Sequence, residues 1–181
     1  MPLKTLIVIA AALAAPAFAQ DGPGPYAGQQ ARAIKALSDA DRAGLLEGQG
    51  MGYAKAAELN GYPGPTHVLE LASQLQLSSE QRAATRKLLA DHKAAARQLG
   101  AALVEAEGAL DTLFASRRAD EASVRRTTAE IARLQGELRA EHLKTHLAQA
   151  ALLRPEQIQH YAQLRGYAVQ GAGAGGHQHR H

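Results

Sequence analysis

Apolar side chains recur at steps of three and four residues over two long segments of the chain, 80–116 and 121–152. This spacing puts them on one side of an α-helix, so each segment is predicted to form a long amphipathic helix. The predicted inner positions of the first helix are Leu88, His92, Ala95, Leu99, Ala102, Ala106, Leu110 and Leu113. Those of the second are Val124, Thr127, Ile131, Leu134, Leu138, His142, Thr145, Gln149 and Leu152. Only the sequence "SRRAD" separates the two helices, which favours an antiparallel helical hairpin.

Shorter helices are predicted on both sides of this hairpin. Ser38 is a good N-cap for "DADRAGLLEG", and "YAKAAELN" is predicted to form a second short helix that ends at Gly61. Thr66 is expected to cap "HVLELASQLQL", and Pro155 suits the first turn of a final helix, "PEQIQHYAQLRGY". The predicted fold class is therefore all-α, a long antiparallel helical hairpin with shorter flanking helices.

The two ends of the chain are expected to lie outside the folded domain. Residues 1–19 combine Lys4, an apolar run and the sequence Ala-Phe-Ala, which predicts a secretory signal peptide cleaved near Ala19. Residues 20–37 are rich in Gly and Pro and are interpreted as a flexible leader, and residues 168–181 as a disordered Gly- and His-rich tail. The mature protein is therefore expected to reach a bacterial periplasm and not to be embedded in the membrane.

Composition supports a helical fold and excludes several classes of function. Aromatic residues make up only 4% of the chain and cysteine is absent, so disulfides, thiol catalysis and cysteine-ligated metals are excluded. The formal net charge is +3, with basic and acidic residues interspersed, which argues against nucleic-acid binding. The motifs of serine hydrolases, zinc proteases, P-loop proteins and dinucleotide-binding enzymes do not occur, so an enzyme is not expected.

One five-residue phrase is written twice, as "LSSEQ" from Leu77 and as "LRPEQ" from Leu153. In the first copy, Ser78 is expected to accept a hydrogen bond from the backbone of the next helical turn, and a polar side chain should reach back to the cap. The leucine just outside the helix should pack inward. Because the two long helices are similar in length, the hairpin should bring both copies to the same end of the fold.

The repeated phrase resembles the paired L-T-x-x-Q signature of the Spy/CpxP family of periplasmic helical-hairpin proteins, which is related to periplasmic heavy-metal sensors. The matching residues are Leu77, Ser78, Gln81, Leu153 and Gln157. The resemblance covers residues 66–167. The short helical segment 38–65 before it has no counterpart in the motif, so its role stays open.

The resemblance implies ATP-independent chaperoning, regulation of envelope-stress sensing, or heavy-metal sensing. The leading prediction is a chaperone or stress regulator of Spy/CpxP type, with unfolded or stress-sensing periplasmic proteins as partners and no required cofactor. A homodimer is one way to cover the open face of the hairpin. Candidate residues for the basic rims of a client surface are Lys87, Lys93, Arg97, Arg133 and Arg139. Ordinary solvated helix faces would give the same pattern.

The alternative prediction is a metal-binding or metal-sensing protein that uses histidines. His142 and His146 lie one helical turn apart, and the hairpin register places His92 opposite them, with Glu141 or Asp91 as an additional carboxylate. Imidazole and carboxylate suit Zn²⁺, Ni²⁺, Co²⁺ or Cu²⁺. Hydrogen bonding among partly buried histidines would explain the same pattern without a metal. Candidate accessory chelators in the tail are His177, His179 and His181.

Overall fold

The computed structural model describes residues 24–167. The predicted signal peptide and the tail with His177, His179 and His181 lie outside the described residues. The chain divides into two compact units, Met1–Gln30 and Ala31–His181. The described part of the first unit contains turns that lead into a short 3-10 helix, η1 (Gln29–Ala31). All the α-helices found between residues 24 and 167 belong to the second unit.

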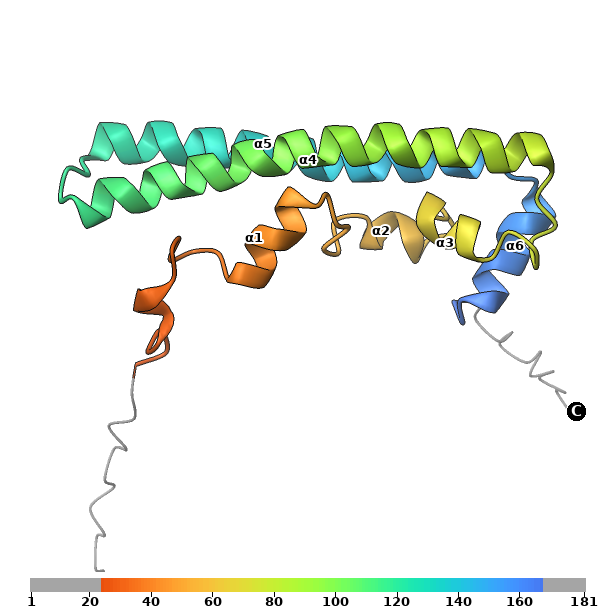
Figure 1. The fold of residues 1–181 in the computed structure, drawn as a ribbon, viewed down its shortest axis with the longest axis horizontal. Helices are drawn as coiled ribbons and strands as arrows, with labels where there is room; N and C mark the ends of the chain where they lie inside the picture. Colours follow the sequence, from red (N-terminus) through yellow and green to blue (C-terminus); the bar gives the residue numbers. More distant parts are fainter. Residues whose placement is uncertain (1–23, 168–181) are drawn as a thin grey trace, which may run out of the picture. The chain divides into compact units, whose positions relative to one another are not determined.

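The predicted helical hairpin is confirmed as the centre of the second unit (Figure 1). Helix α4 (Ser79–Ala115) and helix α5 (Glu121–Ala151) pack against each other along their length. The turn between them ends at Asp120, whose side chain accepts a hydrogen bond from the backbone nitrogen of Ser123 at 2.7 Å. This cap fixes the start of α5 by satisfying a backbone amide that has no partner within the helix.

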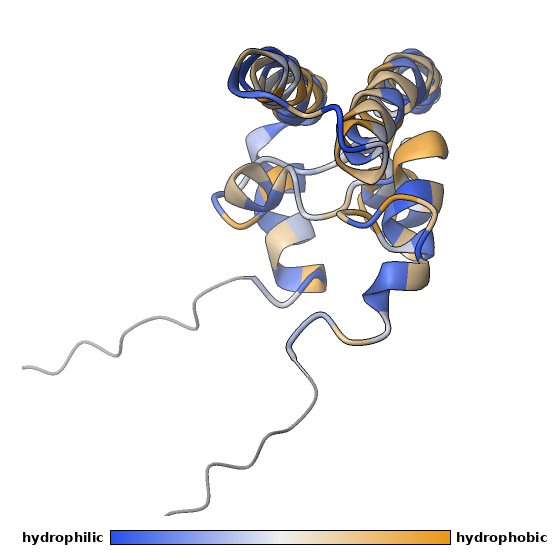
Figure 2. Cartoon of the chain, turned by 90° about the vertical axis from the view of Figure 1, so that its left-hand side faces the viewer, coloured by the Kyte–Doolittle hydropathy of each residue, from blue (hydrophilic) through white to orange (hydrophobic). Residues whose placement is uncertain are grey.

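Four short helices accompany the hairpin. They are α1 (Asp39–Leu46), α2 (Lys55–Glu58), α3 (Pro65–Glu70) and α6 (Pro155–Leu164). Helix α1 packs on α4, α2 packs on α5, and α3 contacts both long helices. Figure 2, which looks along the hairpin, shows the two long helices side by side with the short helices beneath them. Residues 38–65, whose role the sequence leaves open, contain α1 and α2 and therefore supply a second layer of the fold.

The start and the length of α3 differ from the prediction. Gly64, and not Thr66, is the N-cap, because Pro65 fits the first helical turn, where its missing N–H is not needed. The helix also ends at Glu70 and does not continue to Leu77, and turns follow up to Gln76, whose φ is +49°. Such a left-handed residue cannot belong to an α-helix.

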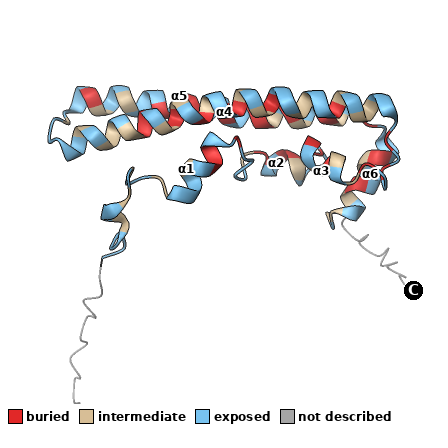
Figure 3. Ribbon diagram, in the orientation of Figure 1, coloured by how far each residue is buried: buried red, intermediate tan, exposed pale blue. Residues whose placement is uncertain are grey.

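The apolar core consists of two clusters. One fills the space between α1, α4 and α5 and includes Leu45, Leu103 and Ile131. The other joins α3, α6 and the chain before α4, and includes Val68, Leu75 and Tyr161. Figure 3 shows that buried positions recur along both long helices and on α6, whereas the loop of the hairpin is exposed.

Over residues 95–103 the buried face of α4 is shifted by one residue from the predicted face, whereas His92 and Ala106 are buried as predicted. Three positions predicted to be inner are only half-buried: Ala95, Leu99 and Ala102. Their neighbours are buried: Ala96, Gly100 and Leu103. The reason is the contact with α1, since a Cβ atom added at Gly100 would lie 2.1 Å from the backbone oxygen of Leu45. Helix α4 packs against both α5 and α1, so its most buried side is the one that faces these two helices.

The repeated phrase forms a side-chain pair that closes the hairpin. The side-chain nitrogen Nε2 of Gln81 donates to Oε1 of Gln157 at 2.9 Å, and Nε2 of Gln157 donates to Oε1 of Gln81 at 3.1 Å. Each side-chain oxygen also accepts from the backbone of its own N-cap, Ser78 or Arg154. The expected cap at Ser78 is confirmed, because its hydroxyl accepts from the backbone of Gln81 at 3.1 Å. The two copies therefore meet at one end of the fold.

Candidate functional site

A cavity of about 510 Å³ lies between the long helices and the second layer. One wall comes from α4 and α5, and the other comes from the Gly-rich turn 48–52, from α2 and from the start of α3. Arg165 and Tyr167, just after α6, complete the lining. Three histidines predicted from the sequence line this cavity together: His92, His142 and His146. The hairpin register expected from the sequence is observed, since the rings of His92 and His142 are 4.5 Å apart.

The hydrogen bonds of His92 fix which of its nitrogens carries the proton. Its Nδ1 lies 3.1 Å from the hydroxyl of Thr145 and 3.4 Å from a carboxylate oxygen of Glu141. The Thr145 hydroxyl already donates its hydrogen to the backbone oxygen of Glu141, so it can only accept from His92. Nδ1 therefore carries the proton and Nε2 carries the lone pair. A metal-ligating histidine usually donates one ring N–H to a carboxylate or another acceptor and binds the metal with its other ring nitrogen.

His146 is held in the same tautomer by the second layer. Its Nδ1 lies 2.7 Å from the backbone oxygen of Tyr62, which can only accept, so Nδ1 is the donor and Nε2 carries the lone pair. The ring packs over Gly64, where an added Cβ would lie 2.8 Å from Cε1 of His146. Glycine at this position allows the imidazole to approach the backbone of the second layer.

His142 is the most deeply buried of the three histidines, with 3% of its surface exposed. Its ring stacks on Tyr53 with 5.5 Å between centroids, and its Nε2 has no hydrogen-bond partner among the described residues. Burial, together with repulsion from His92 and His146, lowers the pKa of His142 to about 4. Burial also lowers the pKa of His92, although Glu141 opposes this shift. Both rings are therefore neutral at pH 7, the protonation state in which imidazole binds metals.

The donor atoms at this cavity suit a transition-metal ion in their chemistry. Two imidazoles present Nε2 lone pairs, and the buried Nε2 of a third has no partner in the part of the chain that the structure describes, so His92, His142 and His146 are the residues that would hold such an ion. Within residues 24–167, however, no three His, Asp or Glu side chains are already grouped closely enough to hold a metal ion. Glu141 points to His92 and is also paired with Lys144, so it supports the histidine from behind.

A polar network centred on Glu58 ties the second layer to α5 and α6. One carboxylate oxygen of Glu58 accepts from the hydroxyl of Tyr161, and the other accepts from the backbone nitrogen of Gly64 at 3.2 Å. The second oxygen also lies 3.6 Å from Nδ1 of His146. Burial and the bond to Glu58 raise the pKa of Tyr161, so its phenol stays protonated and acts as a donor.

Sequence reasoning missed four residues at this site: Glu58 and Arg165 line the cavity, Tyr53 stacks on His142, and Tyr161 donates to Glu58. Tyr161 carried one signal, because a tyrosine on the inner face of a helix needs a partner for its hydroxyl. That partner, Glu58, is 103 residues away in the chain, and no local rule connects the two.

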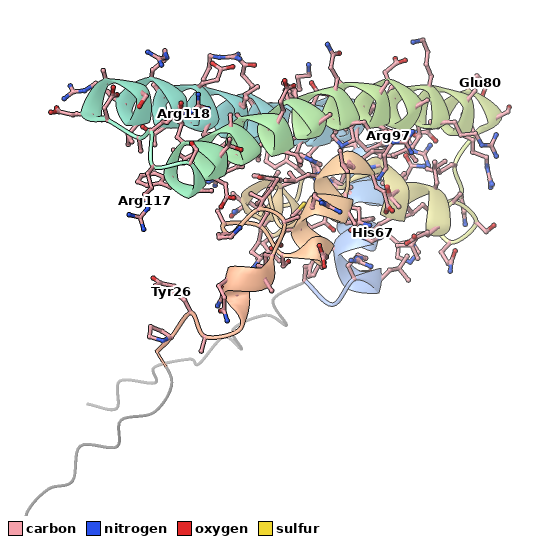
Figure 4. All side chains as sticks on the ribbon, turned by 60° about the vertical axis from the view of Figure 1, so that its left-hand side comes forward. Tyr26, His67, Glu80, Arg97, Arg117 and Arg118 are labelled. Atoms are coloured by element: carbon pink, nitrogen blue, oxygen red, sulfur yellow. The ribbon has the colours of Figure 1, made fainter. Side chains whose placement is uncertain are left out.

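Four of the five candidate residues of the basic rim already contact other residues of this chain. Lys93 and Arg97 donate to backbone oxygens after α1, at Gly48 and Glu47, and Figure 4 shows Arg97 beside the short helices. Lys87 pairs with Asp91, and Arg133 pairs with Glu130 and Glu137. Arg139 makes no ion pair with any residue in the described range. Arg117 and Arg118, which were not among the candidates, lie at the loop of the hairpin (Figure 4).

The family model described as heavy-metal resistance matches residues 53–160, which is more than half of the chain and includes most of the cavity lining. Searches of curated proteins and of solved structures gave no match. In residues 24–167, no helix is long and apolar enough to cross a membrane. Proteins of the matched family are generally periplasmic. The chain belongs to the heavy-metal resistance family, within the Spy/CpxP-like superfamily of periplasmic helical proteins.

Proposed function

We propose that this protein is a non-catalytic periplasmic metal-binding protein, which takes Zn²⁺, Ni²⁺, Co²⁺ or Cu²⁺ in the histidine cavity and thereby serves heavy-metal resistance. The observation that carries this proposal is the set of imidazole nitrogens around one cavity. Hydrogen bonds at Nδ1 leave the Nε2 lone pairs of His92 and His146 available, and the buried Nε2 of His142 has no partner among the described residues.

The positions of these residues support a sensing role. All three histidines belong to the hairpin, and His146 is in addition hydrogen-bonded to the second layer through Tyr62. A metal ion bound by His146 together with His92 or His142 would therefore link the long helices to the segment that covers them. Because burial keeps His92 and His142 neutral, protons compete weakly for these two ligands at neutral pH.

Calorimetric titration of the metal-free full chain with Zn²⁺, Ni²⁺, Co²⁺ and Cu²⁺ tests the proposal. His142→Ala should weaken the binding of the preferred ion by about tenfold or more, because it removes one ligand. His160→Ala is the matched control, since His160 is an exposed helical histidine outside the cavity. A variant that lacks residues 170–181 separates the tail histidines from the cavity. The proposal would be overturned if metal binding is lost when residues 170–181 are removed but is unchanged by His142→Ala.

A second candidate function, client binding without ATP, is favoured by an exposed apolar surface on the second layer. Met51 and Leu59 line a hollow of about 560 Å³ together with Lys55 and Arg139, and both apolar side chains are more than 40% exposed. Exposed apolar groups beside cations suit a partly unfolded protein that carries apolar and acidic side chains. A chaperone should suppress the aggregation of an unfolding client with metal absent, and Leu59→Ser should weaken that activity.

A further inference from the structure

We infer that the histidine cavity also binds a small organic carboxylate through Arg165, and that this carboxylate completes the coordination of the metal. Binding of the carboxylate to the metal-free protein stands by itself, and its role as a metal ligand rests on the proposed function. Three features of the cavity support this inference: its size, the balance of charge on its lining, and two buried nitrogen atoms that have no partner among the described residues.

The cavity is much larger than a metal ion needs. Its volume of about 510 Å³ lies within the range of roughly 300–1,000 Å³ that is usual for small-molecule sites. The walls are mixed, with Leu59, Pro65 and Tyr167 as apolar contacts and several polar groups between them. A small organic molecule could therefore occupy the space beside the imidazoles.

The fixed charges around the cavity favour an anion. Lys55, Lys93 and Arg165 line it, and Glu58 is the only acidic residue in the lining. Both carboxylate oxygens of Glu58 are already used as acceptors by Tyr161 and Gly64. The surplus of positive charge attracts an anion, and the charge of a metal ion at the neutral imidazoles would increase that attraction.

Two buried nitrogen atoms without hydrogen-bond partners belong to residues that line this cavity. They are Nε2 of His142 and Nε of Arg165. Among the described residues, the only other buried side-chain atom without a hydrogen-bond partner is an oxygen, Oε1 of Gln149. Arg165 forms an ion pair with Glu58, but its Nε lies 3.8 Å from Oε1 of Glu58, which is too far for a hydrogen bond. A buried guanidinium N–H without an acceptor is costly, and a carboxylate oxygen is the acceptor it pairs with best.

The same anion would also supply what the metal site lacks. Among the described residues the protein does not group three acidic or imidazole side chains around one point. Carboxylate oxygen is a good ligand for Zn²⁺ and for the neighbouring divalent ions, as is imidazole nitrogen. A carboxylate anchored on Arg165 would add an oxygen ligand from the side of the cavity that holds no carboxylate free to coordinate.

Titration of the metal-free full chain with acetate, citrate and inorganic phosphate tests the first part. Citrate should bind, and both Arg165→Met and Arg165→Lys should weaken its binding by about tenfold, because both remove the Nε–H donor. Circular dichroism shows whether these variants are folded. Arg139→Met is the matched control and should change citrate affinity by no more than about twofold, because Arg139 lies outside this cavity. Absence of citrate binding, or equal affinity for phosphate, would overturn the inference.

The second part is tested on the Co²⁺-loaded protein. Acetate should change the visible absorption spectrum of the bound cobalt, and Arg165→Met should abolish that change while cobalt remains bound. If Co²⁺ binds and acetate leaves the spectrum unchanged, the ligand role is wrong and the proposed metal function stands. If citrate binds through Arg165 but none of the four metal ions binds, the proposed metal function fails and the anion site remains.

Discussion

The two halves of the α4–α5 hairpin are packed in different ways. Toward the loop, most buried side chains are apolar, namely Leu103, Ala106, Ile131, Leu134 and Leu138, and the buried polar ones are Glu107 and Ser123. Toward the open end, where the cavity lies, most buried side chains are polar, namely Thr85, His92, Glu141, His142, Thr145 and Gln149, and Ala96 is the apolar one. The same two helices thus carry a mainly apolar core in one half and a mainly polar core in the other.

This difference indicates which half is specialised for function. Burial of polar groups costs free energy unless each group finds a partner, and two atoms of the polar half, on His142 and Gln149, have none among the described residues. Apolar residues of similar size would pack at the same positions without that cost. The polar half is therefore better explained by binding than by stability, and the loop half by stability.

The largest effect is expected for a cavity made in the apolar half. Leu103→Ala removes a side chain that is 2% exposed, so the free energy of unfolding should fall by about 3 kcal/mol. Urea unfolding followed by circular dichroism measures the change. Leu147→Ala is the matched control, because Leu147 is 55% exposed and its loss should cost less than about 1 kcal/mol. Equal losses for the two variants would contradict this account of the core.

Acid should act on the polar half. His142 has a pKa of about 4 in the folded protein, below its ordinary value of 6.5, because it is buried. Between these values the unfolded chain binds a proton that the folded protein does not. The free energy of unfolding should therefore fall as the pH drops from about 6.5 to 4, by about 2–3 kcal/mol, and the shift at His92 acts in the same direction.

Urea unfolding at several pH values measures this effect. His142→Leu should reduce the pH dependence, because it removes the buried titrating group, and should leave the stability at pH 7 unchanged or higher. A pH dependence that is as steep in the variant as in the natural chain would show that other groups cause it.

A smaller loss is expected at the glutamine pair that closes the polar half. Gln157→Ala removes the reciprocal bonds with Gln81 and leaves the backbone oxygen of Leu75 without its side-chain donor, so the protein should lose about 2 kcal/mol. Thermal unfolding measures the loss. Gln135→Ala, at an exposed position on α5, is the control and should change stability by less than about 0.5 kcal/mol.

The smallest effect has the opposite sign and concerns the outer face of α5. Gly136→Ala should stabilise the protein by about 0.5–1 kcal/mol, because an added Cβ meets no atom within 4 Å and alanine favours the helix. Gly100→Ala, the same change on the inner face of α4, should destabilise the protein, because its Cβ would collide with the backbone of α1. Stabilisation by both changes would show that α1 does not pack as described.

The sequence predicts the hairpin well because the relevant rules are local or periodic. Spacing gave the long helices, caps gave their ends at Ser78 and Asp120, and the short loop gave the register that brings His92 to His142. The second layer was not predictable in this way, because its contacts join distant residues. The position of α1 against Gly100, and the bond between Glu58 and Tyr161, depend on three-dimensional packing that no spacing rule describes.

The Gln81–Gln157 pair has a consequence for the range of conditions in which the fold persists. Both side chains are uncharged amides that neither gain nor lose protons, and salt does not screen the bonds between them. The junction that holds the start of α4 to the start of α6 should therefore stay closed while the histidines beside the cavity change their protonation or their ligands. The Gln81–Gln157 pair should therefore be insensitive to pH and salt, whereas the histidine cavity beside it should respond to pH.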